Sequence, residues 1–339
     1  SSSSSSSSSE LHGGRDGGRG VDAPDPVRTF GSGISAFVRF TRPHTMFGTA
    51  ISVTSVSCLA LRHLGDLVSA EFAGGLLAAL ASALAMNISI VGLNQLYDID
   101  IDRINKPYLP LASGEFTVAT GAAIVAGSAI LSLAIGLATG SVPLLLTLVT
   151  SLTLGVAYST DLPLLRWKRF PVLAATCILA VRAVIVQLGF FAHINTAVFK
   201  LDYYFWRGGL WWTNKALVFG TVFMTLFSVV IALFKDMPDT LGDEKAGLKT
   251  LSIRIGTEKV FQAGLAILGV AYAGAVAVGF TCTHGWSRVV TVAAHAGLVS
   301  LLAWKAREVD CRNPQALYTF YMFIWKLFYI EYALLPLIR

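Results

Sequence analysis

Long apolar blocks separated by short polar segments dominate the chain from about residue 46 onward. Each block holds about twenty mostly apolar residues, the length at which an α-helix crosses about 30 Å of hydrocarbon. No segment shows the alternating pattern of an outer-membrane β-barrel strand. The pattern predicts an all-α polytopic membrane protein with nine transmembrane helices in one bundle, at about 46–64, 72–96, 118–139, 142–160, 172–193, 214–234, 259–281, 287–305 and 316–337.

The composition agrees with this prediction and excludes an ordinary soluble enzyme. Of the 339 residues, 54% are hydrophobic and only 14% are charged, and the mean hydropathy is +0.65. About a quarter of the residues are charged in a typical soluble domain. The lipid bilayer is therefore the expected environment of the chain.

The first 33 residues differ from the rest. They open with nine serines and continue with Gly, Arg, Asp and Pro, and they hold too few apolar residues to bury a core. We expect 1–33 to be a disordered N-terminal leader, and its Ser and Arg content is also typical of a transit-peptide remnant. Residues 34–339 are expected to form a single transmembrane domain.

The positive charges are distributed unevenly between the two ends of the expected spans. The formal net charge is +6, and most Lys and Arg lie before the first span or after even-numbered spans. By the positive-inside rule, this side faces the cytoplasm, or the stroma or matrix of an organelle. No basic block interleaved with aromatic residues indicates nucleic acid, and nothing in the sequence identifies a protein partner.

A first acidic cluster, Asn94-Gln95-Leu96-Tyr97-Asp98-Ile99-Asp100-Ile101-Asp102, follows the second span. If the helix continues through it, Asn94, Asp98 and Asp102 recur every four residues and lie on one stripe. Asp100 is turned away from that stripe and receives a lesser role. Carboxylate and amide oxygens suit a hard cation such as Mg²⁺, which is held by one or two carboxylates and by substrate phosphates.

A second acidic cluster on the same side follows the sixth span and runs from Lys235 to Asp243. Asp239 and Asp243 repeat the four-residue spacing, and Asp236 lies three residues before Asp239. Facing carboxylate clusters repel unless cations lie between them, so the pair indicates a divalent metal. The alternative is that these residues are solvated loop acids.

Several cations accompany the clusters, and their functional role is open because positive-inside topology alone places Lys and Arg there. The cations that lie on the acidic side and suit a phosphorylated ligand are Arg39, Arg42, Arg103, Lys106, Arg166, Lys168 and Arg169. Arg182 lies inside the fifth span, where we expect it to contact an anionic ligand or to pair with an inward-facing acid. In the last span, Lys326 and Glu331 are expected to pair with each other.

The motif Asn94-x-x-x-Asp98-x-x-x-Asp102, followed by Asp239-x-x-x-Asp243, resembles the UbiA superfamily of intramembrane aromatic prenyltransferases, which have nine transmembrane helices. The resemblance covers about residue 37 to the end. It is closest to plant plastid homogentisate prenyltransferases in the runs 39–45 (RFTRPHT), 94–114 (NQLYDIDIDRINKPYLPLASG), 165–170 (LRWKRF) and 320–329 (FYMFIWKLFY).

The resemblance implies Mg²⁺-dependent transfer of a prenyl group, phytyl in the first place, from its diphosphate to homogentisate. The acceptor loses its carboxyl group and yields a precursor of tocopherols. The implied location is a chloroplast membrane, the inner envelope, with the active site facing the stroma.

The resemblance also implies roles for individual residues. Asp98, Asp102, Asp239 and Asp243 are the implied catalytic residues. The implied metal ligands are Asn94, Asp98, Asp102, Asp236, Asp239 and Asp243. The residues expected to bind the diphosphate or the acceptor are Asn94, Arg42, Lys106, Tyr158, Lys168, Arg182 and Lys235, although Tyr158 and Lys168 are further apart than the Y-x-x-x-K pair of bacterial members.

Alternatives remain at this stage. Within the enzyme class, they are homogentisate geranylgeranyl transfer and prenylation of flavonoids or coumarins, because donor length and acceptor choice depend on pocket side chains that the sequence does not place. From other classes, they are a polytopic transporter whose intramembrane acids carry ions and an assembly subunit without turnover.

Overall fold

The computed structural model describes residues 26–201, 214–245, 247–248 and 250–339. All regular structure in these residues is helical. Helix α1 (Pro26–Thr41) begins inside the segment expected to be a leader, and residues 1–25 lie outside the described residues. The contacts group Ala36–Arg339 into one unit.

Within the described residues, eight helical segments are long and apolar enough to cross a membrane, so the predicted all-α membrane fold is confirmed. They are α3 (Ala70–Tyr97), α6 (Val118–Ala138), α7 (Val142–Ser159), the stretch Val172–Val198, α12 (Lys215–Phe234), α15 (Thr257–Phe280), α16 (Gly285–Ala306) and α17 (Pro314–Leu334) with the turn η5 (Leu335–Leu337). The remaining predicted span, the first one at about 46–64, corresponds to α2 (Pro43–Leu59). This helix has 17 residues and ends five residues before the predicted boundary at 64.

Polar side chains fix where several of these helices begin. In each case, the side chain of the capping residue accepts a hydrogen bond from a backbone N–H of the first turn, which would otherwise lack a partner. The capping residues are Ser69 (α3), Thr117 (α6), Ser141 (α7), Asn214 (α12) and Asn313 (α17).

The fifth span is not a regular helix. It consists of α8 (Pro171–Leu179), a π-helical segment η3 (Ala180–Ile185), α9 (Val186–His193) and a second π-helical segment η4 (Ile194–Val198). π-Helical segments are rare and often lie at functional sites. Arg182 lies in the first of them.

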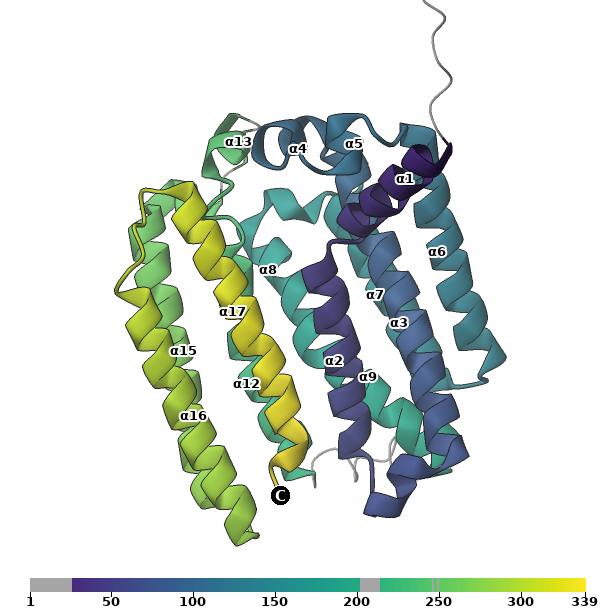
Figure 1. Ribbon diagram of the computed structural model, residues 1–339, viewed down its shortest axis with the longest axis vertical. Helices are drawn as coiled ribbons and strands as arrows, with labels where there is room; N and C mark the ends of the chain where they lie inside the picture. Colours follow the sequence, from purple (N-terminus) through teal and green to yellow (C-terminus); the bar gives the residue numbers. More distant parts are fainter. Residues whose placement is uncertain (1–25, 202–213, 246, 249) are drawn as a thin grey trace, which may run out of the picture. The chain divides into compact units, whose positions relative to one another are not determined.

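Helices α2, α3, α7, α8, α9, α12 and α17 pack around one another in the unit Ala36–Arg339, and the remaining spans cover them (Figure 1). Helix α6 packs on α3 and α7, and α15 and α16 pair beside α12 and α17. Aromatic side chains fill the contact between α12, α15 and α17, where Phe234 stacks on Phe261 and Phe227 contacts Tyr272 and Phe328.

The last span corrects one expectation. Glu331 is buried, and its Oε2 atom lies 3.0 Å from Nε2 of His295 in α16. The predicted pair between Glu331 and Lys326 is therefore wrong, since the acid turns into the bundle and Lys326 is exposed.

Short helices lie across one end of the spans, at the top of Figure 1. They are α4 (Ile99–Asn105), α5 (Pro110–Ser113) and α13 (Thr240–Lys245), and α14 (Leu251–Ile255) follows α13. Helix α4 contacts α13 although the two are far apart in the sequence. This contact brings the two acidic clusters to the same end of the bundle.

Candidate active site

The first acidic cluster lies where one helix stops and another starts. Helix α3 ends at Tyr97, Asp98 has the non-helical angles φ −117° and ψ 15°, and α4 begins at Ile99. The helix therefore does not continue unbroken through the cluster, which was the condition for placing its acids on one stripe. The four-residue relation survives the break, because the backbone N–H of Asp102 donates to the carbonyl oxygen of Asp98 at 2.7 Å. Asn94 Nδ2 donates to Asp98 Oδ2 at 3.0 Å.

Asp100 points away from this cluster, as the helical phase predicts. Its side chain is 91% exposed and pairs with Arg103 at 2.8 Å. Asp102, two residues later, is only 7% exposed.

The second acidic cluster lies between the end of α12 at Phe234 and the start of α13 at Thr240. The backbone N–H of Asp243 donates to the carbonyl oxygen of Asp239 at 3.0 Å, so the four-residue spacing again places two acids on one side of a turn. Asp243 is 6% exposed.

Side chains of α4 connect the two clusters directly. Asn105 Nδ2 donates to Asp243 Oδ1 at 3.3 Å, and Asn105 Oδ1 accepts from the backbone N–H of Gly242 at 3.1 Å. Lys106 forms an ion pair with Asp239. Gly242 permits this approach, because a Cβ atom at that position would overlap the Asn105 amide. The clusters therefore face each other, joined by a hydrogen bond between residues that are 137 apart in the chain.

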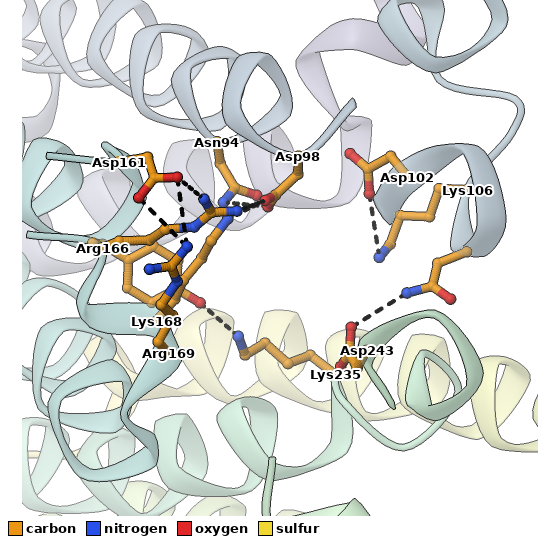
Figure 2. Close-up of polar contacts among 12 residues, drawn as sticks. Asn94, Asp98, Asp102, Lys106, Asp161, Arg166, Lys168, Arg169, Lys235 and Asp243 are labelled. Atoms are coloured by element: carbon orange, nitrogen blue, oxygen red, sulfur yellow. Dashed lines mark hydrogen bonds and ion pairs between the residues drawn. The ribbon is translucent and has the colours of Figure 1, made fainter. Parts of the chain in front are cut away.

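Basic side chains reach the clusters from three further positions. Lys168 forms an ion pair with Asp98, and Arg166 lies 3.9 Å from the same carboxylate while pairing with Asp161. Lys235 lies 3.3 Å from Asp236. In Figure 2, the Asp98 group and the Asp102 group lie on either side of an open region that Lys235 approaches from α12.

Tyr158 contacts a different lysine from the one implied by the resemblance. Its hydroxyl accepts a hydrogen bond from Lys235 Nζ at 2.7 Å, whereas Lys168 is engaged with Asp98. The contact joins α7 to the second acidic cluster.

Two buried carboxylates, Asp102 and Asp243, lack a close cation. The nearest cationic nitrogen to Asp102 is Lys106 Nζ at 3.9 Å, and Asp243 has no ion-pair partner among the described residues. Burial raises the pKa of Asp102 from 3.8 to about 6, although Lys106 opposes the rise. Burial, together with the Asp236 and Asp239 carboxylates, raises the pKa of Asp243 to about 7. Both shifts reflect negative charge that is not compensated locally.

This donor set fits a divalent ion that also binds a phosphorylated ligand. Among the described residues, no three His, Cys, Asp or Glu side chains converge closely enough to hold an ion by themselves. Mg²⁺ is commonly held by one or two carboxylates and completes its shell with waters and substrate phosphates. Asp102 and Asp243, one from each cluster, offer such carboxylates beside a shared opening.

A cavity of about 750 Å³ leads from the two clusters into the bundle. Its wall contains Arg42, Asn94, Asp98, Asp102, Lys106, Tyr158, Lys168, Arg182, Lys235, Asp236, Asp239 and Asp243, which are all the residues expected from the sequence to form the site. Further inside, the wall is more apolar and aromatic and includes Leu154, Val229, Trp325 and Phe328. The cavity therefore has a charged entrance and an apolar interior.

Two residues of the site, Asn105 and Trp325, were not among those expected. Asn105 lies three residues after Asp102 on the same helix, and this spacing could have identified it. Trp325 lies in the run 320–329 that carries the resemblance, but an aromatic residue in an apolar span is usually part of the core. Arg166 was expected with Lys168 as a cation for a phosphorylated ligand, and the fold turns it toward Asp98.

The fold and this cavity define a class of protein: an integral membrane protein with a cavity whose entrance, at one end of the helices, is lined by acidic and basic side chains. The chain belongs to the UbiA prenyltransferase family, whose model matches residues 50–327. The transporter and the assembly subunit without turnover are therefore set aside, since this family consists of enzymes.

Curated relatives and solved structures agree with this assignment. The homogentisate geranylgeranyltransferase of Triticum aestivum is 51% identical over 307 residues, which cover 90% of this chain and 73% of the relative. The chloroplastic homogentisate phytyltransferase 1 of Arabidopsis thaliana is 49% identical over 318 residues, covering 94% and 79%. A UbiA homologue from Archaeoglobus fulgidus, solved with GPP and Mg²⁺, is similar in fold with a TM-score of 0.60 at 17% identity, covering 89% of this chain and 99% of that one.

Proposed function

We propose that the protein is a Mg²⁺-dependent homogentisate prenyltransferase that transfers a phytyl group from phytyl diphosphate and releases the acceptor's carboxyl group as CO₂. The observation that carries the proposal is the cavity, in which two facing acidic clusters form the entrance and an apolar wall continues inward. A long isoprenoid diphosphate likewise has a charged group, the diphosphate, at one end and an apolar chain behind it. The relatives named for homogentisate transfer at about half sequence identity support the acceptor.

The donor diphosphate lies at the entrance in this proposal. Asn94, Asp98, Asp102, Asp236, Asp239 and Asp243 hold the metal ions that carry it, and Arg42, Lys106, Lys168 and Lys235 contact its oxygens. In the structure, Lys168 and Lys106 are paired with Asp98 and Asp239. These lysines therefore neutralise the carboxylates before the ligand arrives and are within reach of the diphosphate afterwards. Tyr158 keeps Lys235 aimed at the entrance.

The chemistry begins with cleavage of the allylic C–O bond of the donor. Mg²⁺ bound at the clusters supplies charge neutralisation for the departing diphosphate. Lys106 and Lys168 add fixed positive charge where negative charge develops, in a wall that excludes bulk water. The apolar interior prevents water from trapping the allylic cation as an alcohol.

The acceptor completes the reaction. A ring carbon ortho to a hydroxyl group attacks C1 of the prenyl group, which forms the C–C bond, and the ring carbon then loses its proton. The CH₂–COO⁻ bond breaks, CO₂ leaves, and the methylene carbon gains one proton to become a methyl group. The proton lost by the ring balances the proton gained, and diphosphate and CO₂ are the other products.

Geranylgeranyl diphosphate is the second candidate donor. The wheat relative named for geranylgeranyl transfer is as similar to this chain as the relative named for phytyl transfer. Both donors carry a C20 chain, so the entrance does not discriminate between them. Flavonoid and coumarin acceptors are less supported, since the relatives named for them are 38–42% identical.

We further propose that the protein lies in a chloroplast membrane, the inner envelope, with the cavity entrance facing the stroma. The chloroplastic relative supports the organelle. The excess of Lys and Arg at the entrance end supports the orientation by the positive-inside rule.

A donor-by-acceptor panel tests the proposal. Purified protein in lipid nanodiscs is incubated with phytyl, geranylgeranyl or dimethylallyl diphosphate, with homogentisate or naringenin, and with Mg²⁺ or EDTA. We expect methyl-phytyl-benzoquinol as the main product, and one CO₂ per product from carboxyl-labelled homogentisate. Prenylation of naringenin without turnover of homogentisate would refute the acceptor assignment.

A further inference from the structure

Arg182 is a cation inside the membrane bundle, and the sequence leaves open whether it binds the diphosphate or the acceptor. It lies in the π-helical segment η3, on the wall of the cavity, and is half-buried. Its guanidinium carbon is 4.7 Å from the ring centroid of Trp325, within the range of a cation–π contact. The side chain is therefore held in a defined direction.

Unlike the lysines at the entrance, Arg182 has no acidic partner. Lys106, Lys168 and Lys235 each form an ion pair with an aspartate. Arg182 forms no ion pair and no side-chain hydrogen bond with any described residue. The ionisable groups that act on it most are Tyr321, Tyr332, Arg42 and Tyr329, and none of them is an aspartate or a glutamate.

Burial of a cation at this position is unfavourable unless an anion pairs with it, because a low-dielectric interior stabilises a charge much less than water does. The cation–π contact with Trp325 offsets only part of that cost. A partner can reach Arg182 from the cavity, since Arg182 lines it. Arg182 therefore has no anionic partner among the described residues, and a ligand bound in the cavity can provide one.

Trp325 is held in place by its neighbours, so its contact with Arg182 fixes the orientation of the Arg182 side chain. The Trp325 side chain is 1% exposed. It contacts His44 with ring centroids 5.2 Å apart and Phe328 at 5.4 Å. Gly48 of α2 leaves the space for it, because a Cβ atom there would lie 2.8 Å from Trp325 Cζ3.

We propose that Arg182, oriented by Trp325, binds the carboxylate of an aromatic-acid acceptor and so selects acids over neutral phenols. The proposal rests on the proposed function, in which the acceptor carries one carboxylate. A carboxylate and a guanidinium form two parallel charge-assisted hydrogen bonds, which fix the ring as well as bind it. The groups with the largest effect on Arg182 include none of the aspartates that would hold the metal ions, which favours the acceptor carboxylate over the diphosphate as its partner.

The test measures binding as well as turnover. Isothermal titration follows homogentisate and its carboxamide binding to the full-length protein in nanodiscs, loaded with Mg²⁺ and an unreactive thiolodiphosphate analogue of the donor. The variants are Arg182→Gln and Arg182→Lys. Arg288→Gln is the matched control, since Arg288 is an exposed arginine of α16 outside the cavity wall.

We expect wild-type protein and Arg288→Gln to bind homogentisate about ten- to a hundredfold more tightly than its carboxamide, the factor for one charged hydrogen-bonded pair. Arg182→Gln loses that factor for the acid and binds the two compounds equally, while the KM for the donor changes less than about twofold. Arg182→Lys retains part of the preference, which shows that the loss is not caused by misfolding.

Other outcomes overturn the proposal. If wild-type protein binds acid and carboxamide equally, no carboxylate site exists, whatever the variants do. If Arg182→Gln raises the donor KM and leaves homogentisate binding unchanged, Arg182 serves the diphosphate. Absence of any prenylated product from homogentisate refutes the proposed function separately, because the preference for the acid and its loss in Arg182→Gln are measured without turnover.

Discussion

Asp102 and Asp100 form a matched pair for testing the role of the acidic clusters. They are two residues apart on α4, and one is buried in the cavity wall while the other is 91% exposed on its side chain and pairs with Arg103. Replacing each with Asn removes the same charge and leaves the side-chain volume almost unchanged. We expect Asp102→Asn to abolish most of the turnover and Asp100→Asn to leave it within about twofold.

The magnitudes follow from the surroundings of Asp102. Burial raises its pKa from 3.8 to about 6, which corresponds to about 3 kcal/mol against the charged form in the folded protein at neutral pH. Because the pKa of Asp102 is higher in the folded than in the unfolded protein, its ionisation lowers the free energy of unfolding above about pH 4. Asp102→Asn removes this penalty and loses only the 3.9 Å pair with Lys106. The metal-free variant should therefore be at least as stable as wild type.

Activity should change in the opposite direction. Loss of one preorganised charge that stabilises a transition state lowers kcat by about 10²–10³. The assay is the steady-state rate of prenylated product at saturating donor, acceptor and Mg²⁺, with the melting temperature of the EDTA-treated protein measured in parallel. Near-normal kcat in Asp102→Asn, or equal losses in both variants, would refute the role given to Asp102.

Three further predictions concern other contacts of the site. Tyr158→Phe removes the 2.7 Å hydrogen bond to Lys235. It should raise the donor KM by about two- to tenfold, with little effect on the acceptor KM. An unchanged donor KM would show that Tyr158 does not contribute to diphosphate binding. Asn105→Leu removes both contacts that join α4 to α13 and should raise the Mg²⁺ concentration for half-maximal activity, whereas an unchanged Mg²⁺ dependence would show that the connection is dispensable. Removal of divalent ions with EDTA should abolish product formation and added MgCl₂ should restore it, and full activity in EDTA would exclude a metal-dependent reaction.

The sequence predicted the spans well because the bilayer imposes one strong rule. A segment must be apolar over about twenty residues, and its backbone hydrogen bonds must be satisfied internally. The ends of α6, α7 and α12 accordingly fall within one or two residues of the predicted limits. Helix α2 ends early because the apolar run continues past Leu59 into a non-helical turn, a difference that hydropathy alone does not detect.

The residues expected to form the candidate site all line one cavity, but the sequence did not predict which of them contact each other. Spacing alone placed Asp98 and Asp102 on one side, and the cavity wall contains both. Spacing did not reveal that Asp98 interrupts the helix or that Tyr158 meets Lys235, because both depend on how distant segments meet. The link between Asn105 and Asp243 spans 138 residues and is a property of the fold.

Binding of an unreactive thiolodiphosphate analogue tests most directly whether the two acidic clusters hold one Mg²⁺-bound diphosphate. Its affinity is measured by titration with and without Mg²⁺ for wild type, Asp98→Asn from the first cluster and Asp239→Asn from the second. The account predicts binding that requires Mg²⁺ and is weakened at least about tenfold by either substitution. Binding that needs no divalent ion, or that depends on one cluster alone, would contradict it.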